Sequence, residues 1–569
     1  MDRSIGVITT ILLLTSTAAI LMSAAPIAGA QDDDTVKVAM FALEGTPYGA
    51  WTKNGWKTGL EYAADSGTYE DSEWTAGDRT IETKTYSTYK APSEIVSDAR
   101  SAIDDWGADI LVGAVLSSTG KKLASVAESR QTPYWLCPAA ASSLTEKPTF
   151  SKYVFRAGRN SWHDAITAAY IQQEYQPEAE TIAFMGEDYI FGQDGIDAAK
   201  SAFEDVGLDT VAIEYPPKDT TEFGPYLDRI QNADPDLVFV AWAGATEYKS
   251  MYDAMNERGM LEKLVPAVID YYSMNYLNVA TDGLYEGRTG FAYFGHGVTT
   301  NEVYEAQLSL YEDYDITPDA SLAPTIPDND VASALGSSNA PELFGGVGFA
   351  TAQFVVEGVR QAPSIAPDSL IATWEGMTLQ TAYGETTIRP EDHQAMRPMF
   401  VAETQVDTDS ESTMYNALHG YTQETLSKEY VENHIPVNTD YEPISGLDVS
   451  IDASTDSGVA PVDVDFDASV SGGVSPYSYE WSLGNGETAT GSSAEVTYEN
   501  ANTDGYDVTL EVTDNAGTTG SASATVKVYE SAEQQEEEEG GGMSTTVIAA
   551  AVVVVVVVVV AAVFLMRSQ

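Results

Sequence analysis

The chain has 569 residues, of which 87 are acidic and 28 are basic, so its formal net charge at pH 7 is −59. That balance excludes nucleic acid as a partner, because a phosphate backbone is bound by a basic surface. A single cysteine, Cys137, excludes disulfide scaffolds and cysteine-based metal centres, and with only five scattered histidines we expect no metal and no cofactor.

The acidic residues are spread through the whole sequence instead of forming one tail. Two interpretations are open: a haloarchaeal type of surface adapted to a salty cell, or an ordinary acidic protein outside the cytoplasm. In molar salt the Debye length falls to about 3 Å, so surface carboxylates barely repel one another. We favour the halophilic interpretation, which predicts that stability depends on high salt.

Residues 1–30 have the pattern of a secretory signal peptide. Arg3 supplies a short positive region, residues 5–22 are apolar apart from small hydroxyl residues, and Ala28-Gly29-Ala30 forms a small-residue cleavage site. The alternative is an uncleaved membrane helix. We expect the chain to be exported from the cytoplasm.

From residue 35 to about residue 440, short apolar segments alternate with amphipathic ones, as strands alternate with helices in α/β proteins. We expect strands at residues 36–41, 109–113, 134–136, 181–185 and 236–241, and helices at residues 50–64, 93–106, 193–206, 246–258 and 346–360. This order predicts an α/β fold of parallel sheets with helices on both faces. About 400 residues are too many for one sheet, so we expect two lobes.

In open parallel sheets, ligands bind at the loops that follow the carboxyl ends of the strands. Three such loops carry small residues, at positions 44–49, 114–120 and 137–143. The run Ser117-Ser118-Thr119, expected to open a helix at Thr119, offers hydroxyl groups and free backbone N–H groups that suit a carboxylate. The alternative is that this run only caps the helix.

Several segments, in the same order along the chain, resemble the solute-binding proteins of ABC importers for branched-chain amino acids and amides, the leucine-binding type. These segments are Gly45–Gly49, Gly113–Thr119, Cys137–Ser142, Tyr153–Arg156, Gly186–Gly192, Arg389–Gln394 and Arg397–Phe400. Residues 315–341, rich in Pro, Ser, Asp and Ala, depart from the family pattern and are interpreted as a surface insertion.

The resemblance implies a type I periplasmic binding protein, in which two Rossmann-like lobes joined by three crossings close on a small ligand. We expect lobe 1 at about residues 35–157 and 288–400, and lobe 2 at about residues 158–287 and 401–435. The crossings are expected near residues 157–160, 283–289 and 400–404.

By position, the resemblance gives six residues of lobe 1 a part in binding the ligand's carboxylate or amide. They are Ser117, Ser118 and Thr119, with Ala139, Ala141 and Ser142 behind them. Ala141 stands where the family often has threonine, and Ser142 could replace the missing hydroxyl.

On lobe 2, the resemblance implies an acid after a strand that pairs with the ligand's ammonium group, and Asp270 fits that position. A desolvated carboxylate opposite an ammonium gives strong charge complementarity. The alternative for Asp270 is a cap at the end of a strand. Tyr48 and Trp242 are candidate walls for the ligand's apolar part, with Tyr189 on the corresponding loop of lobe 2. The alternative for these aromatic residues is core packing.

Three further residues attract attention because of their chemistry. His163 begins a helix and is expected to be a surface or capping residue. His393 is expected to fix a loop instead of contacting the ligand. Cys137 is expected to be a small, buried apolar residue.

In residues 446–530 apolar and polar residues alternate with a period of two, and Gly, Ser and Thr separate the short strands. This pattern predicts a β-sandwich. The segment Trp481-Ser-Leu-Gly-Asn-Gly486 resembles the Trp-x-Phe-Gly-Asp-Gly motif of PKD domains. We expect Trp481 to pack in the core, and Gly484 and Gly486 to form the turn. Such modules usually act as spacers or contact surfaces, so we assign this one no chemistry.

Residues 531–546 are acidic and then glycine-rich, as in a linker. Residues 547–566 form an unbroken run of 20 apolar residues, long enough for a transmembrane helix. Arg567 follows this run directly, which predicts that the C-terminus lies in the cytoplasm.

Together these features predict an exported solute-binding protein, anchored in the membrane by its C-terminal helix, that delivers an amino acid or a small amide such as urea to an ABC permease. Two alternatives remain open: a sensory ligand-binding protein that reports to a signalling partner, and a structural or adhesion protein of the cell surface. No G-x-S-x-G, H-E-x-x-H or P-loop motif occurs, so we expect neither catalytic residues nor an enzyme.

Overall fold

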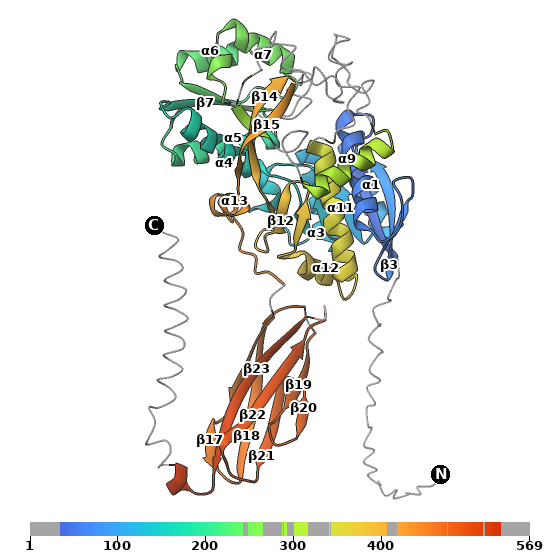
Figure 1. Ribbon diagram of the computed structural model, residues 1–569, viewed down its shortest axis with the longest axis vertical. Helices are drawn as coiled ribbons and strands as arrows, with labels where there is room; N and C mark the ends of the chain where they lie inside the picture. The colour runs from blue at the N-terminus through green and yellow to red at the C-terminus, as the bar shows by residue number, and fades with distance from the viewer. Residues whose placement is uncertain are drawn as a thin grey trace, which may run out of the picture.

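The computed structural model describes residues 35–242, 248–265, 287, 289–292, 301–316, 341, 343–406, 418–444, 447–474, 476–515 and 518–535. In these residues the chain forms two α/β lobes and a β-sandwich (Figure 1). The following expected features lie outside them: the signal peptide, most of the crossing near 283–289, most of the insertion at 315–341, the linker beyond residue 535, the transmembrane segment and Asp270. Within the described part, no helix is long and apolar enough to cross a membrane.

A six-stranded sheet forms the centre of lobe 1. Its strands lie in the order β2 (Glu73–Ala76), β3 (Arg79–Ser87), β1 (Thr35–Ala42), β4 (Ile110–Gly113), β5 (Tyr134–Leu136) and β6 (Val154–Arg156). Every neighbouring pair is parallel except β2 and β3, which are antiparallel at one edge. This confirms the predicted parallel sheet.

Helices pack on both faces of this sheet. They are α1 (Pro47–Ala63), α2 (Pro92–Asp104), α3 (Ser117–Arg130), α9 (Glu302–Asp313), α11 (Leu343–Gln361) and α12 (Pro367–Trp374). Successive side chains of a strand point to opposite faces. Val38 and Met40 of β1 therefore share a core with α1 and α11, whereas Ala39 and Phe41 share one with α2 and α3.

Glycine residues bring α1 and α11 into close contact. A Cβ atom added at Gly348 of α11 would lie 2.4 Å from the carbonyl oxygen of Thr52 in α1. One added at Gly55 of α1 would lie 2.0 Å from the carbonyl oxygen of Gly345. No side chain fits in these gaps, so the two backbones approach each other only because glycine stands at these positions.

Lobe 2 has a smaller parallel sheet of order β8 (Asp209–Glu214), β7 (Thr181–Gly186) and β9 (Leu237–Ala241). Its helices are α4 (Ser161–Tyr175), α5 (Ile190–Asp205), α6 (Gly224–Asn232) and α7 (Tyr248–Glu257), followed by the 3-10 turn η2 (Leu261–Lys263). Phe184 of β7 packs toward α5, and Ala183 and Met185 pack toward α6 and α7. Lobe 2 thus repeats the two-faced packing of lobe 1.

Two described segments run between the lobes. β6 ends in lobe 1 at Arg156 and α4 begins in lobe 2 at Ser161, so residues 157–160 form the first crossing. The long strand β14 (Met399–Val406) lies between β10 (Thr289–Ala292) and β15 (Leu418–Leu426) and runs up beside lobe 2 in Figure 1.

A small sheet and a short helix lie beside the crossings. The sheet consists of β11 (Thr378–Thr381), β12 (Gly384–Ile388) and β13 (Ala395–Met396), and the helix is α13 (Lys428–His434). α13 contacts both β13 and α4 of lobe 2. The ring of Tyr430 in α13 packs edge-on against Tyr170 of α4, with 5.6 Å between the ring centroids. α13 therefore bridges the small sheet and lobe 2.

The C-terminal sandwich has two sheets of mainly antiparallel strands. One has the order β16 (Leu447–Ala453), β18 (Val462–Gly472) and β21 (Ser493–Tyr498); the other has the order β17 (Ser457–Val459), β23 (Thr519–Tyr529), β22 (Asn502–Thr513), β19 (Ser478–Ser482) and β20 (Thr488–Thr490). Trp481 is buried near Phe466, and its indole N–H donates to the carbonyl of Gly491 over 2.9 Å. Gly484 and Gly486 both have positive φ, as the predicted turn requires.

Candidate functional site

The small-residue loops after β4 and β5 lie side by side at the carboxyl edge of the lobe 1 sheet. The backbone N–H of Ala141 donates to the hydroxyl of Ser117 over 3.2 Å. The N–H of Ala139 donates to the carbonyl of Ala114 over 3.0 Å, and Ala114 has a left-handed φ of 73°. The structure therefore brings the two predicted loops together, and their contact with a ligand stays a prediction.

Helix α3 begins at Ser117, two residues earlier than predicted. Its N-cap is Leu116, which makes no side-chain capping bond. The serines and Thr119 thus occupy the first turn of the helix instead of capping it, since the residue before the run already has the extended cap conformation. Ser117 and Thr119 are buried, as are Ala139, Ala141 and Ser142, while Ser118 is half-buried.

Tyr189 of lobe 2 reaches the first turn of α3. It is the N-cap residue of α5, and its hydroxyl accepts a hydrogen bond from the backbone N–H of Ser118 over 3.0 Å. The ammonium of Lys218 lies 4.8 Å from the centre of the Tyr189 ring. Burial raises the pKa of the Tyr189 hydroxyl, so it stays protonated at neutral pH. Of the two predicted contacts on lobe 2 that the structure describes, Tyr189 and Trp242, it is Tyr189 that lies against the lobe 1 loops.

A second hydrogen bond joins the lobes one turn further along α5. The backbone N–H of Ser143, in the 3-10 turn η1 (Ser142–Thr145), donates to Oδ2 of Asp194 over 2.9 Å. Burial raises the pKa of the Asp194 carboxyl above its usual range. Phe191 of the same helix lies 5.5 Å from the guanidinium of Arg159 in the first crossing. The first turns of α5 are therefore the part of lobe 2 that faces lobe 1.

The two predicted aromatic walls lie in different surroundings. Tyr48 is half-buried on lobe 1, with its ring 4.8 Å from that of Phe344. Trp242 is buried in the core of lobe 2, edge-on to Phe223 at 5.2 Å. This packing agrees with the core alternative for Trp242. Asp270 lies outside the described residues, so its pairing with an ammonium group stays a prediction.

The structure adds one acidic residue that the sequence analysis did not weigh. Glu187 directly follows β7, the central strand of the lobe 2 sheet, and is fully buried. Its backbone N–H donates to the carbonyl of Ala241, and its carbonyl accepts from the N–H of Tyr189. The signal was visible in the sequence, as an acid at the end of a buried strand, which is the same reason that favoured Asp270.

His163, His393 and Cys137 lie where they support the fold. His163 caps α4: its Nδ1 accepts from the N–H of Asn160, so the capping prediction is confirmed. The surface alternative does not hold, because the ring is fully buried, and this burial lowers the pKa of His163. His393 holds a left-handed loop conformation and lies within 3.1 Å of a carboxylate oxygen of Glu375, as expected of a loop-fixing residue. Cys137 is fully buried, which confirms the prediction for it.

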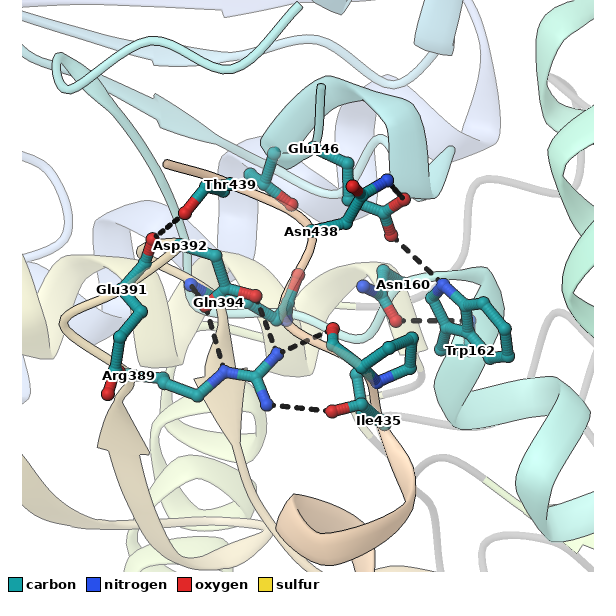
Figure 2. Close-up of polar contacts among 12 residues, drawn as sticks. Glu146, Asn160, Trp162, Arg389, Glu391, Asp392, Gln394, Ile435, Asn438 and Thr439 are labelled. Carbon is teal, nitrogen blue, oxygen red and sulfur yellow. Dashed lines mark hydrogen bonds and ion pairs between the residues drawn. The ribbon is translucent and has the colours of Figure 1, made fainter. Parts of the chain in front are cut away.

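A cluster of polar contacts surrounds the first crossing (Figure 2). The carboxylate of Glu146, at the end of η1, accepts a hydrogen bond from the indole N–H of Trp162 in α4 over 3.0 Å. The amide of Gln394 donates to the carbonyl of Gly158 over 2.7 Å. Arg389 forms a two-bond pair with Asp392, at 3.0 and 2.6 Å. These contacts fix the backbone where the chain passes from lobe 1 to lobe 2.

The sequence matches two known families. The family described as a periplasmic binding protein matches residues 35–411, more than half of the chain. The family described as a PKD domain matches residues 449–528, the region of the sandwich. Among curated proteins, the Leu/Ile/Val-binding protein homolog 6 of Brucella abortus is 26% identical over 208 residues, which are 36% of this chain and 50% of the relative. The chain thus spans about half the length of the curated relatives it matches.

Solved structures share the fold of the two lobes. A branched-chain amino acid transporter of the ABC type from Rhodopseudomonas palustris is 26% identical, with a TM-score of 0.55, and covers 71% of this chain and 100% of its own. A solute-binding protein from the same species, in complex with p-hydroxybenzoic acid, is 20% identical, with a TM-score of 0.55 and coverages of 69% and 97%. The Leu-, Ile-, Val-, Thr- and Ala-binding protein from Brucella ovis, in a closed conformation, is 18% identical, with a TM-score of 0.56 and coverages of 71% and 98%. At these last two identities the likeness concerns the fold alone.

Proposed function

This chain belongs to the periplasmic binding protein family and carries a PKD domain, and we propose that it captures a small carboxylate-bearing solute between its lobes and delivers it to the permease of an ABC importer. Membership of this family supports a location outside the cytoplasm and a role in binding instead of catalysis. The observation that carries the proposal is the hydrogen bond from Ser118 to Tyr189, since it brings the first turn of α3 against the facing loop of lobe 2.

The chemistry of lobe 1 suits an anionic group. The first turn of a helix has backbone N–H groups without partners inside the helix, and its dipole favours negative charge. Ser117, Ser118 and Thr119 add hydroxyl groups in this turn of α3. No basic side chain is needed for a carboxylate here, which fits a chain with so few cations.

The chemistry of lobe 2 suits a cationic or hydroxyl group on the same solute. Glu187 is buried beside the Tyr189 loop, and the family resemblance predicts Asp270 as a second acid for this role. A carboxylate-binding lobe opposite an acidic lobe favours a zwitterion, so an amino acid is the leading ligand class. The relatives named for branched-chain amino acids support this class, and the complex with p-hydroxybenzoic acid makes aromatic acids the second.

Delivery in this family rests on closure of the two lobes about their crossings, a hinge motion that traps the ligand. The sandwich and the linker after it are proposed to hold the binding lobes near the membrane, with the apolar segment 547–566 as the anchor. A tethered binding protein meets its permease at a high effective concentration.

Calorimetric titration of the whole chain in molar salt tests the proposal. We expect heat of binding from L-leucine, L-isoleucine or L-valine, or from 4-hydroxybenzoate, and weaker binding after Ser118→Ala or Asp270→Ala. Ser125→Ala, on the exposed side of α3, is the matched control and should leave affinity unchanged. Absence of heat from these compounds, urea and short amides would contradict solute capture and favour a structural role at the cell surface.

A further inference from the structure

The segment between the binding lobes and the sandwich is fastened to lobe 1. Residues 435–444, here called the strap, connect α13 to β16. They lie outside both family matches, which end at residue 411 and resume at residue 449. The strap has no helix or strand, yet hydrogen bonds hold it along most of its length.

The first part of the strap is held by Arg389. Its guanidinium donates to the carbonyls of Ile435 and Pro436 over 2.9 and 3.2 Å, while Asp392 neutralises it from the other side (Figure 2). Arg389 and Asp392 are both buried. A buried arginine with all these partners is a strong attachment point, because it would be costly to leave any of them unmade.

The middle of the strap is held by the turn after η1. The backbone N–H of Lys147 donates to the carbonyl of Asn438 over 2.9 Å, and the amide of Asn438 lies 3.4 Å from the carboxylate of Glu146. The hydroxyl of Thr439 donates to the carbonyl of Glu391 over 2.6 Å. Figure 2 shows Asn438 and Thr439 reaching these two separate parts of lobe 1.

The last part of the strap is held by Tyr441. Its hydroxyl donates to the carboxylate of Glu375 over 2.6 Å, and the same oxygen lies 3.1 Å from Nε2 of the buried His393. The ring of Tyr441 packs against Phe150 at 5.2 Å. Beyond it, the carbonyl of Ile444 accepts from the N–H of Gly473 in the sandwich over 3.0 Å.

The residues that hold the strap also hold the first crossing. The N–H of Arg156 donates to the carbonyl of His393 over 3.0 Å, and Gln394 binds the carbonyl of Gly158. Glu146 binds Asn438 of the strap and Trp162 of lobe 2 with its two oxygens. A movement of lobe 2 about residues 157–160 therefore disturbs the same loops to which the strap is tied.

We propose that the strap restrains the hinge. By fixing the loop 389–394 and Glu146 of lobe 1, it limits how far the lobes open. It also joins the sandwich to lobe 1, so that lobe 2 is the moving lobe. The inference rests on the proposed function only in requiring that the lobes open and close. Loss of the strap contacts shifts the population toward open forms, and a ligand that binds the closed form then binds more weakly.

Pulsed EPR on the ligand-free whole chain tests this. Nitroxides are attached at Lys121→Cys on α3 and Asp205→Cys on α5, which are exposed positions on the two lobes. The native Cys137 is fully buried and burial raises its pKa to about 12, so it stays unlabelled. The variant combines Asn438→Ala, Thr439→Ala and Tyr441→Phe. We expect a longer and broader distance distribution than in the unmodified strap.

The matched control combines Val437→Ala and Glu442→Ala, two exposed strap positions, and should retain the original distribution. Coinciding distributions of the triple variant and this control would overturn the proposal. If the triple variant does not fold, Tyr441→Phe alone should shift the distance distribution less, but in the same direction. An unchanged distribution in Tyr441→Phe would also overturn the proposal. For a solute that the original chain binds, the triple variant should raise Kd roughly twofold to tenfold, the factor that one net hydrogen bond gives.

A separate arm distinguishes failure of the proposed function from failure of the strap. L-leucine or 4-hydroxybenzoate added to the labelled chain should shorten the distance between the lobes if solute capture is correct. No shortening with either compound, together with a clear effect of the triple variant in the ligand-free chain, would contradict solute capture and leave the strap in place. If a ligand shortens the distance but the triple variant has no effect, solute capture is supported and the proposal for the strap is overturned.

Discussion

The backbone N–H of Ser118 in lobe 1 donates to the hydroxyl of Tyr189 in lobe 2 over 3.0 Å. In the proposed function this N–H belongs to the group that receives the solute's carboxylate. The phenol oxygen of Tyr189 thus occupies the donor that a ligand oxygen would use, and a solute has to displace it or share the donor with it.

Replacement of Tyr189 by phenylalanine should therefore strengthen binding of a carboxylate solute. The ring and its packing remain, while the competing hydroxyl is removed. A net hydrogen bond contributes about 0.5–1.5 kcal/mol, so we expect affinity to rise roughly twofold to tenfold by calorimetry. Tyr226→Phe, on the far helix α6, is the control and should change nothing. Weaker binding in Tyr189→Phe would instead assign the hydroxyl to the ligand.

The carboxyl of Asp194 should make stability depend on pH. Burial raises its native-state pKa above the ordinary 3.8, so the native chain holds this proton more tightly than the unfolded chain. Its contribution to stability is therefore complete below about pH 3.8 and is lost as the pH rises through the native pKa. Asp194→Asn keeps an oxygen for the N–H of Ser143 and removes the charge.

We expect Asp194→Asn to be more stable than the original chain at pH 7, with the difference shrinking as the pH is lowered toward 4. Urea midpoints in molar salt at several pH values measure this. Asp205→Asn, at the exposed end of the same helix, is the control. A variant that is less stable at pH 7 would show that the ionised carboxylate is needed, for example as a partner of the nearby Arg156.

The glycine contact between α1 and α11 should not tolerate a methyl group. In Gly348→Ala the new Cβ would lie 2.4 Å from the carbonyl oxygen of Thr52 and 2.7 Å from the backbone nitrogen of Trp56. The two helices have to separate, and we expect a loss of about 1–3 kcal/mol in the free energy of unfolding. In the control Gly224→Ala, the new Cβ meets only the end of the Arg258 side chain, at 3.1 Å, and no backbone atom within 4 Å. Equal effects of the two changes on urea unfolding would disprove the close-packing argument.

Low salt should destabilise the chain because its formal net charge is −59. The Debye length grows from about 3 Å at 1 M to about 10 Å at 0.1 M, so repulsion between surface carboxylates becomes effective. We expect the melting temperature to fall steadily as KCl is reduced over this range. Replacing the salt by an equal osmolarity of sucrose should not restore it. A melting temperature that is independent of salt would contradict the halophilic interpretation.

The strands were the most predictable elements, for a physical reason. Parallel strands buried on both faces are continuous apolar segments bounded by turn residues, so Tyr134–Leu136 and residues 236–241 were located to within one residue. Helix starts were less predictable. A run of serines and threonine is a common capping pattern, but the extended residue before it, Leu116, already serves as the N-cap of α3.

Contacts between distant segments left no pattern in the sequence. His163 was expected at the surface or in a helix cap because it starts a helix, yet its ring is fully buried in the assembled fold. The strap was missed because it has no periodicity, and its contacts are remote: Asn438 and Glu146 are 292 positions apart. Such pairs follow from the assembled fold, not from local preference.

Among the described residues, two hydrogen bonds join the start of α5 and its N-cap to lobe 1, and their donors and acceptors differ in kind. Both donors, at Ser118 and Ser143, are main-chain groups, and both acceptors, on Tyr189 and Asp194, are side chains. A backbone N–H group remains after almost any substitution, whereas a side-chain acceptor is lost when its residue is replaced. Divergence of such a protein toward new solutes can therefore proceed on α5 alone, with lobe 1 kept as a constant template.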